Sequence, residues 1–215
     1  AVKPRTSPYD FQGLGPEGWA MMAAAAKQHQ LLTVSEVMHD SQLPVASDHI
    51  DIIQVGARNM QNTALLTALG DSHHPVLLKR GPSATYQEWL LAAEYILQRG
   101  NPNVILCERG IRTFEPATRH TLDVAAVPMI KHLSHLPIIV DPSHGTGHRH
   151  AVPSMARAAV AAGADGIMLE VHPQPEQSRS DAQQSLGTQC LEELTPSLYA
   201  LHQALKHNHA QPCTP

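Results

Sequence analysis

The chain has 215 residues, of which 42% are hydrophobic and 16% are charged, and this composition is sufficient for a globular core. Its formal net charge of −4 argues against a nucleic acid or an anionic membrane as a partner. No apolar run approaches the roughly 18 residues of a transmembrane helix, and the first residues do not resemble a signal peptide. The three cysteines lie far apart and outside any C-x-x-C motif, which indicates a reducing, cytoplasmic setting without disulfides.

Short apolar runs alternate with longer segments of helical composition along the chain. Strands are expected at residues 31–36, 50–55, 75–79, 103–108, 136–141 and 165–170. Helices are expected at residues 17–30, 60–69, 85–99, 121–132, 151–162 and 189–206. Strict alternation of strand and helix predicts a parallel sheet, and both an open doubly wound sheet and a TIM barrel would provide one.

A polar residue lies at or just beyond the carboxyl end of each predicted strand. These residues are Glu36, Arg58, Lys79, Arg109, His144 and Glu170. A barrel would bring the six strand ends into one ring around a pocket, whereas an open sheet would spread them over ~25 Å at ~4.8 Å per strand. No G-x-G-x-x-G or P-loop motif supports a nucleotide-binding open sheet. We therefore expect an α/β TIM (β/α)8 barrel, forming one catalytic domain over residues 1–215, although the sequence shows only six strands.

The basic residues of this ring indicate an anionic substrate. Arg58 and Arg109 offer guanidinium groups that can bind phosphate or carboxylate through two hydrogen bonds, and Lys79 adds a compact positive charge. Lys3 and Arg5, in the loop that opens the chain, are expected over the same mouth. So much positive charge around one cavity predicts that two anionic groups are held at once.

His144, Glu170 and Asp181 offer one nitrogen and two oxygen ligands, a set that suits a divalent metal. Asp181 lies in the loop after the last predicted strand, so it can fold back over the mouth. A metal in this position would polarise a carbonyl group or activate a water molecule. The role of Glu36 stays open between positioning a substrate and forming a structural salt bridge.

Several motifs resemble 3-deoxy-D-arabino-heptulosonate 7-phosphate (DAHP) synthase, in the branch that is often fused to a chorismate mutase or a ferredoxin-like regulatory domain. The longest match is the opening segment Lys3-Pro-Arg-Thr-Ser-Pro-Tyr-Asp-Phe-Gln-Gly-Leu-Gly15. Further matches follow in the same order at residues 54–62, 77–81, 105–113, 140–147, 170–173 and 180–184. The resemblance covers nearly the whole chain.

The resemblance implies a metal-dependent TIM barrel that condenses phosphoenolpyruvate with erythrose 4-phosphate and releases phosphate, the first step of the shikimate pathway to chorismate and the aromatic amino acids. It implies that Arg58 and Arg109 hold the phosphate of phosphoenolpyruvate, and that Lys79 holds its carboxylate and takes part in proton transfer. The residues implied to line the erythrose 4-phosphate site are Lys3, Pro4, Arg5 and Thr6.

The metal ligands implied by the resemblance are His144, Glu170 and Asp181, binding Mn²⁺, Fe²⁺, Co²⁺ or Zn²⁺. Lys79 and His144 are the candidate catalytic residues. A cytoplasmic homo-oligomer is expected.

The chain departs from the family pattern at its start. It lacks the Gly-Pro-Cys motif that supplies a fourth metal ligand at the end of the first barrel strand, and an arginine just upstream of the opening motif. We therefore expect strands three to eight of the barrel, with the first two missing. Such a chain on its own is expected to have little or no synthase activity and to associate through its open strand edges.

Three alternatives differ in class from this hypothesis. The first is the sister enzyme that makes 3-deoxy-octulosonate 8-phosphate, which shares the Cys-Glu-Arg-Gly type of motif. The second is a non-catalytic module that binds phosphate. The third is a barrel lyase or aldolase that uses Lys79 to form a Schiff base.

Overall fold

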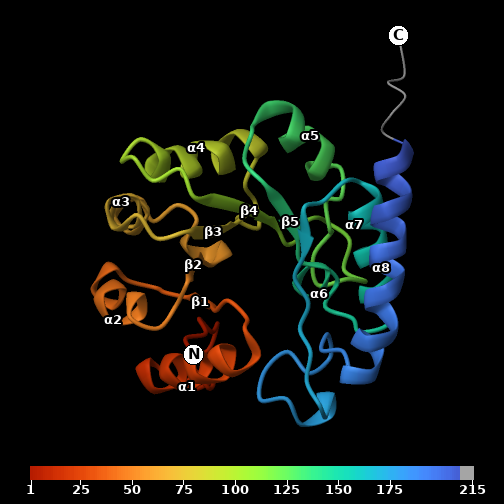
Figure 1. Cartoon of the computed structure of the whole chain (residues 1–215), viewed down its shortest axis with the longest axis horizontal. Helices are drawn as coiled ribbons and strands as arrows, with labels where there is room; N and C mark the ends of the chain where they lie inside the picture. Colours follow the sequence, from red (N-terminus) through yellow and green to blue (C-terminus); the bar gives the residue numbers. More distant parts are fainter. Residues whose placement is uncertain (209–215) are drawn as a thin grey trace. The chain divides into compact units, whose positions relative to one another are not determined.

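The computed structural model describes residues 1–208, and these form two compact units that divide between Cys107 and Glu108 (Figure 1). The expectation of one domain stays a prediction. Among residues 1–208, no helix combines the length and the apolar character needed to cross a membrane. Cys213 lies outside the described residues, whereas Cys107 and Cys190 are not joined in a disulfide.

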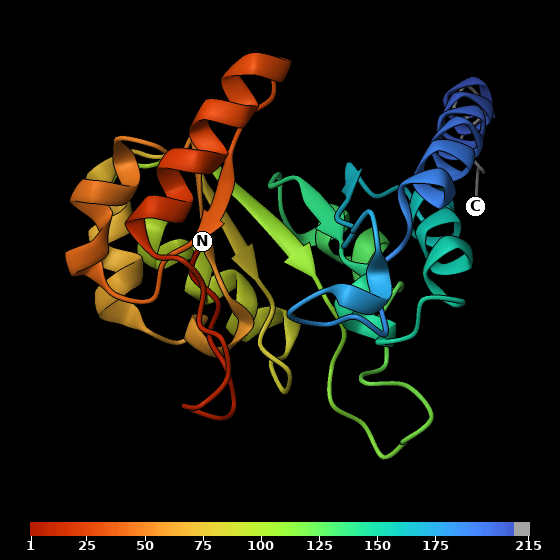
Figure 2. The same cartoon turned by 90° about the horizontal axis from the view of Figure 1, so that it is seen from below.

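The first unit is built on parallel strands that follow one another in chain order. They are β1 (Val34–Glu36), β2 (Ile52–Val55), β3 (Val76–Lys79) and β4 (Val104–Glu108). The register places Glu36 opposite Gln54, and Lys79 opposite Cys107. Because the strands are parallel, their carboxyl ends lie at the same edge, as their arrowheads show in Figure 2.

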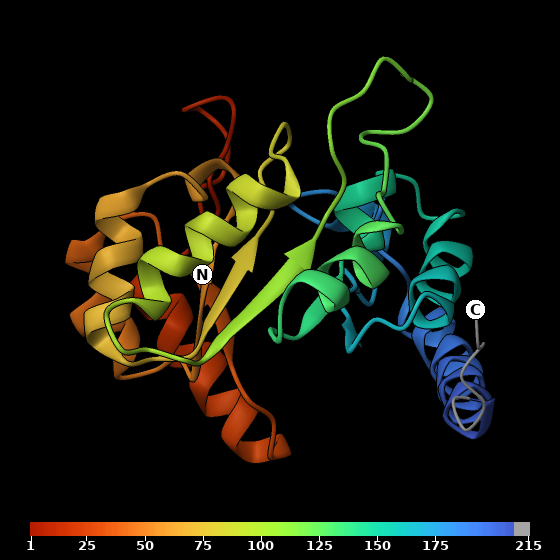
Figure 3. The ribbon, with the colours of Figure 1, turned by 90° about the horizontal axis from the view of Figure 1, so that it is seen from above.

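Helices cover the strands of this unit. They are α1 (Pro16–His29), α2 (Leu43–Ser47), α3 (Thr63–Ser72) and α4 (Tyr86–Leu97), with short 3₁₀ turns at η1 (Asp40–Gln42) and η2 (Ala57–Asn59). Helix α4 begins at a capping box in which Thr85 and Glu88 bond each other's backbone N–H groups. It lies over β3 and β4 in Figure 3, and its buried Trp89 donates from Nε1 to the carbonyl of Leu78.

The second unit pairs β5 (Ile138–Val140) in parallel with β6 (Gly166–Ile167). Its helices are α5 (Ala126–Leu133), α6 (Pro142–Thr146), α7 (Val152–Ala161) and α8 (Thr188–Asn208), and η3 (Pro175–Gln177) is a short 3₁₀ turn. Helices α7 and α8 lie side by side in Figure 1, packed around a core of Val152, Ala156, Leu186 and Leu194.

The six predicted strands are all present, parallel within each unit, and each is followed by a helix. The strands of the first unit pair in chain order, without the reversal of a doubly wound sheet, which confirms the barrel class. Two predicted helices begin later than expected. The helix expected from residue 121 begins at Ala126, because Thr121 is extended and bridges Ile111. The helix expected from residue 60 begins at Thr63, after η2, with the side chain of Asn62 as its cap.

Candidate active site

Three of the predicted site residues come together from the carboxyl ends of strands in the first unit. Glu36 is the last residue of β1, Lys79 is the last residue of β3, and Arg58 lies in η2, just after β2. The carboxylate of Glu36 accepts a hydrogen bond from the side-chain amide of Gln54 at 3.2 Å. Lys79 is only 5% exposed, so its ammonium group is largely removed from water. A largely desolvated lysine interacts strongly with any anion that reaches it.

The opening loop is tied to this strand edge through Arg58. Its guanidinium donates to the carbonyl of Pro4 and to the hydroxyl of Thr6, both at 3.2 Å. The loop closes on itself, since the N–H of Lys3 donates to the carbonyl of Gln12 at 2.9 Å. Figure 2 shows the loop at the arrowhead end of the strands of this unit. The structure therefore brings the four predicted loop residues, Lys3, Pro4, Arg5 and Thr6, to the segment that carries Arg58.

In the second unit, the sequence after β5 turns directly into α6, and this turn fixes His144. Asp141, which is fully buried, caps the helix by accepting the N–H of His144 on Oδ1 at 3.0 Å. Its other oxygen, Oδ2, lies 2.8 Å from Nδ1 of the same imidazole. A carboxylate only accepts hydrogen bonds, so Nδ1 carries a proton, and in the neutral imidazole the lone pair is on Nε2. Nε2 lies 3.4 Å from Oε1 of Glu170.

Glu170 and Asp181 complete a set of metal-ligating groups with His144. One donor atom from each of the three residues lies within 4.8 Å of the donor atoms of the other two. Backbone bonds fix the position of Glu170, since its N–H donates to the hydroxyl of Ser143 at 3.1 Å and its carbonyl accepts from Leu186 at 2.9 Å. The set offers one imidazole nitrogen, from a ring that Asp141 holds in place, and the carboxylates of Glu170 and Asp181. These ligands fit a divalent cation such as Mn²⁺, Fe²⁺, Co²⁺ or Zn²⁺. The predicted ligands are therefore brought together, and the identity of the metal stays open.

Arg109, the remaining predicted cation, lies just after β4 and is 7% exposed. Its Nη1 lies 3.2 Å from the imidazole nitrogens of His120. Burial, followed by the charges of Arg109 and Arg119, lowers the pKa of His120 to about 4. The imidazole is therefore neutral near pH 7, so it can accept a hydrogen bond from the guanidinium and adds no charge of its own.

The loop that carries these residues lies directly against α6. Its residues Arg119 and His120 donate their N–H groups to the carbonyls of Thr146 and Gly145, at 2.9 and 3.0 Å. A Cβ placed on Gly110 would lie 2.9 Å from the Cα of Gly145, and one placed on Gly145 would lie 2.5 Å from a methyl group of Leu122. Gly110 is therefore required by the close approach of the loop to the helix and by its φ of 92°, whereas at Gly145 the side chain of Leu122 would have to move.

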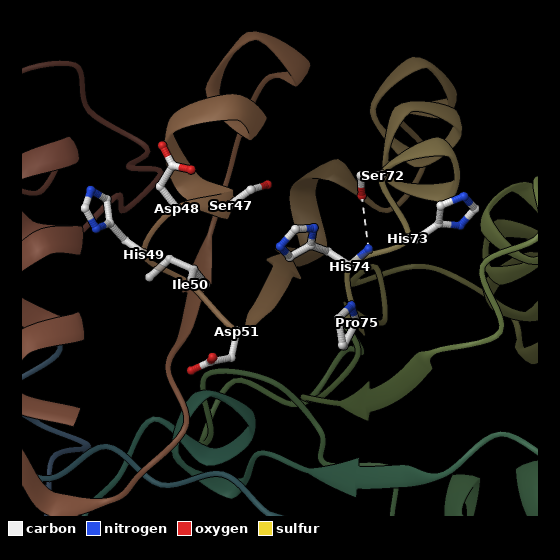
Figure 4. A pocket seen from close by; sticks show the side chains of 9 residues that line it. All are labelled: Ser47, Asp48, His49, Ile50, Asp51, Ser72, His73, His74 and Pro75. Atoms are coloured by element: carbon white, nitrogen blue, oxygen red, sulfur yellow. Dashed lines mark hydrogen bonds between the residues drawn. The ribbon is translucent and has the colours of Figure 1, made fainter. Parts of the chain in front are cut away.

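A separate hollow of about 410 Å³ opens in the first unit, between the segments that precede β2 and β3 (Figure 4). It is lined by Ser47, Asp48, His49, Ile50, Asp51, Ser72, His73, His74 and Pro75. Asp51 precedes β2 and Pro75 precedes β3, so the hollow lies at the amino ends of these strands. The rings of His73 and His74 point in opposite directions in Figure 4. This hollow lies at the edge opposite the one that carries Glu36 and Lys79, and we assign it no role in the chemistry.

Four residues without a predicted role contact the predicted site residues. Asp141 orients His144, His120 contacts Arg109, and Arg119 and Gln184 bond the carboxylates of Asp181 and Glu170. The spacing Asp141-x-x-His144 is a helix-cap signal that sequence reasoning could have used. The other three lie in loops, where no strand end indicates their direction.

Comparison with known proteins gives a consistent result. The family model for the DAHP synthetase I family matches residues 1–207. A phospho-2-dehydro-3-deoxyheptonate aldolase of Thermotoga maritima is 53% identical over 205 residues, which are 95% of this chain and 61% of that protein. A 2-dehydro-3-deoxyphosphooctonate aldolase of Desulfosudis oleivorans is 32% identical over 212 residues, which are 93% of this chain and 75% of that protein.

Two solved structures are similar throughout. The crystal structure of DAHP synthase from Thermotoga maritima has a TM-score of 0.91 and 51% identity, covering 95% of this chain and 60% of that chain. A truncated form of the Thermotoga enzyme has a TM-score of 0.88 and 49% identity, covering 91% of this chain and 74% of that chain. The chain thus spans about three fifths of the length of the full Thermotoga protein that it matches. From the matching family model and these identities, we conclude that the chain belongs to the DAHP synthetase I family.

Proposed function

We propose that this protein is a DAHP synthase, which condenses phosphoenolpyruvate with erythrose 4-phosphate. The observation that carries the proposal is the set of donor atoms from His144, Glu170 and Asp181 within 4.8 Å of one another. The chain is 53% identical to the Thermotoga aldolase, and the motifs that carry these donors resemble those of the family, which supports the proposal. The identity of 32% to a phosphooctonate aldolase makes the sister reaction the second candidate.

The cations are proposed to bind the anionic groups of the substrates. Arg58 and Arg109 are assigned to the phosphate of phosphoenolpyruvate, because guanidinium groups bind phosphate through paired hydrogen bonds. Lys79 is assigned to its carboxylate, where burial strengthens the attraction between the two charges. The erythrose 4-phosphate site is assigned to the loop residues Lys3, Pro4, Arg5 and Thr6, which the contacts of Arg58 hold in place.

The proposed reaction forms one carbon–carbon bond and one carbon–oxygen bond, and it breaks the carbon–oxygen bond to the phosphate. Carbon 3 of phosphoenolpyruvate bonds to the aldehyde carbon of erythrose 4-phosphate, and a water oxygen adds to carbon 2. Phosphate then leaves from carbon 2, which becomes a ketone, and the protons released by water are shared between the new hydroxyl group and the phosphate. A divalent metal in this site would polarise the aldehyde carbonyl.

The residues of the chain prepare the groups that react. Asp141 favours the neutral tautomer of His144 with its proton on Nδ1, which leaves Nε2 available to a metal. Lys79, which is largely buried, is assigned to proton transfer, as the resemblance to the family implies. We also propose a cytoplasmic homo-oligomer, as the resemblance to the family implies.

The test is an assay of phosphoenolpyruvate consumption by the purified protein with Mn²⁺, offered erythrose 4-phosphate or a five-carbon aldose phosphate. The second sugar tests the sister reaction, since an eight-carbon product minus three carbons from phosphoenolpyruvate leaves five. Lys79→Met and His144→Ala should each lower the rate at least 100-fold, whereas Asp165→Asn, which precedes β6 while the donor Glu170 follows it, should not. Preference for the five-carbon sugar would favour the sister enzyme.

Two further outcomes separate the remaining alternatives. Binding of phosphoenolpyruvate without turnover would favour a non-catalytic phosphate-binding module. A borohydride-trapped adduct on Lys79, with turnover that resists a chelator, would favour Schiff-base chemistry. The expectation that a chain without the Gly-Pro-Cys motif has little activity is judged by the same assay.

A further inference from the structure

Two residues outside the metal-donor set connect two of its carboxylates. Nη1 of Arg119 donates to Oδ1 of Asp181 and to the side-chain oxygen of Gln184, each at 3.0 Å. The side-chain nitrogen of Gln184 donates to Oε2 of Glu170 at 2.7 Å. A continuous series of hydrogen bonds therefore runs from Asp181 through Arg119 and Gln184 to Glu170; we call Arg119 and Gln184 the brace.

The direction of each hydrogen bond in the brace is fixed by chemistry. A guanidinium can only donate and an ionised carboxylate can only accept, so the amide of Gln184 must place its oxygen toward Arg119 and its nitrogen toward Glu170. Both ends of the amide are thus used, and the side chain is only 2% exposed. A buried amide with both ends bonded has one favourable orientation, so it holds its partners in fixed positions.

The backbone anchors both members of the brace. The N–H of Arg119 donates to the carbonyl of Thr146 at 2.9 Å, which seats the arginine on the helix that carries His144. Gln184 closes a turn with Asp181, since its N–H donates to the carbonyl of Asp181 at 3.1 Å. The brace therefore joins the loop after β4 to the loop that carries Asp181.

The charge of Arg119 also has a consequence for the site. Two carboxylates placed close together repel each other before a cation arrives, and this repulsion raises the free energy of the metal-free site. The guanidinium, bonded directly to one carboxylate and through Gln184 to the other, reduces that repulsion. A carboxylate has two oxygens, so a bond to the brace and a bond to a metal are compatible.

We propose that Arg119 and Gln184 are positioning residues that hold the carboxylates of Glu170 and Asp181 ready for a divalent cation. This inference rests on the proposed function, because it requires a cation at these donors. Neither residue touches the substrates in this role. They act by fixing the ligands, and loss of such outer contacts typically weakens metal binding 10–100-fold.

The test measures Mn²⁺ affinity by electron paramagnetic resonance, in which the six-line signal of free Mn²⁺ diminishes on binding. Gln184→Met keeps the length of the side chain and removes both of its hydrogen bonds. Gln183→Met, at the exposed neighbouring glutamine, is the matched control. We expect the Kd for Mn²⁺ to rise about 10–100-fold in the first variant and to stay within twofold of wild type in the control.

Arg119→Met tests the brace from its other end, at a side chain that is 38% exposed, so this variant should fold even if Gln184→Met does not. The same rise in Kd is expected. The double variant should bind Mn²⁺ no more weakly than the weaker-binding of the two single variants, because both substitutions break one connected series of hydrogen bonds. Independent structural damage would instead give additive losses.

His144→Ala separates the two proposals. If wild type binds Mn²⁺ and His144→Ala does not, the metal site stands, and an unchanged Kd in folded Gln184→Met and Arg119→Met overturns the brace. If His144→Ala binds Mn²⁺ as tightly as wild type, the metal site itself is wrong, and the role of the brace is rejected with it.

Discussion

Replacement of Asp141 by asparagine should move the proton of His144 from Nδ1 to Nε2. In the structure, Asp141 accepts two hydrogen bonds from that histidine, one from its backbone N–H at 3.0 Å and one from Nδ1 at 2.8 Å. An asparagine side chain has only one oxygen, and the backbone N–H requires it. The amide NH₂ would then face Nδ1, and the proton would move to Nε2, the nitrogen that lies 3.4 Å from Glu170.

The size of the effect follows from this geometry. A proton on Nε2 occupies the lone pair that a metal needs, so the imidazole must change tautomer before it binds. Loss of a carboxylate behind a histidine ligand typically weakens metal affinity 10–100-fold, or about 1.4–2.8 kcal/mol. We expect the Kd of Asp141→Asn for Mn²⁺ to rise by this factor, with the fold retained because the asparagine oxygen still caps α6.

Two measurements check this reasoning. Titration with Mn²⁺, followed by electron paramagnetic resonance, gives the Kd, and long-range ¹H–¹⁵N correlation spectra of the metal-free protein identify which imidazole nitrogen of His144 is protonated. Asp165→Asn is the control, since Asp165 bonds Lys131 and the backbone of β5. The reasoning is refuted if the tautomer is unchanged, or if the tautomer reverses while the Kd stays within twofold of wild type.

Three further predictions concern the first unit. Thr85→Ala removes one half of the capping box of α4 and should lower the free energy of unfolding by about 1 kcal/mol, measured in urea. Hydrogen bonds from the backbone and hydroxyl of Thr33 lower the pKa of Asp51, so the stability that this carboxylate adds is present above its unfolded pKa of about 3.9 and is lost as pH falls through the lower folded pKa. In Asp51→Asn the free energy of unfolding should therefore fall less steeply with decreasing pH below pH ~4, and the same pH dependence as in wild type would contradict this. Arg58→Met removes both hydrogen bonds to the opening loop and should speed amide exchange there, with α4 unaffected.

The strand order could be read from the sequence because each strand is an apolar run with a polar residue at its end. A strand that is buried on both faces requires a continuous run of apolar residues, and neighbouring parallel strands place their polar ends at the same edge. The ends of the helices were less predictable. Helix α6 is not among the expected helices, and it forms because Asp141 caps it and Pro142 suits its first turn.

The candidate metal site shows the same division. His144 and Glu170 could be predicted from their places at strand ends, and Asp181 from its place in a loop that can fold back. The structure brings all three together, while their role as ligands stays a prediction. Arg119 and Gln184 could not be found in this way, because their positions depend on how two long loops meet, and no local pattern encodes that meeting.

The facing glycines Gly110 and Gly145 make one rigid joint of two segments that are far apart in the chain. With no side chain between them, the loop after β4 cannot shift without moving the helix that carries His144. An alanine at Gly110 would press on the backbone of Gly145 and move the loop away, carrying Arg109 with it, whereas an alanine at Gly145 would meet the side chain of Leu122, which can turn aside. Directed evolution of this protein should therefore accept substitution at Gly145 more readily than at Gly110, although neither residue offers a functional group.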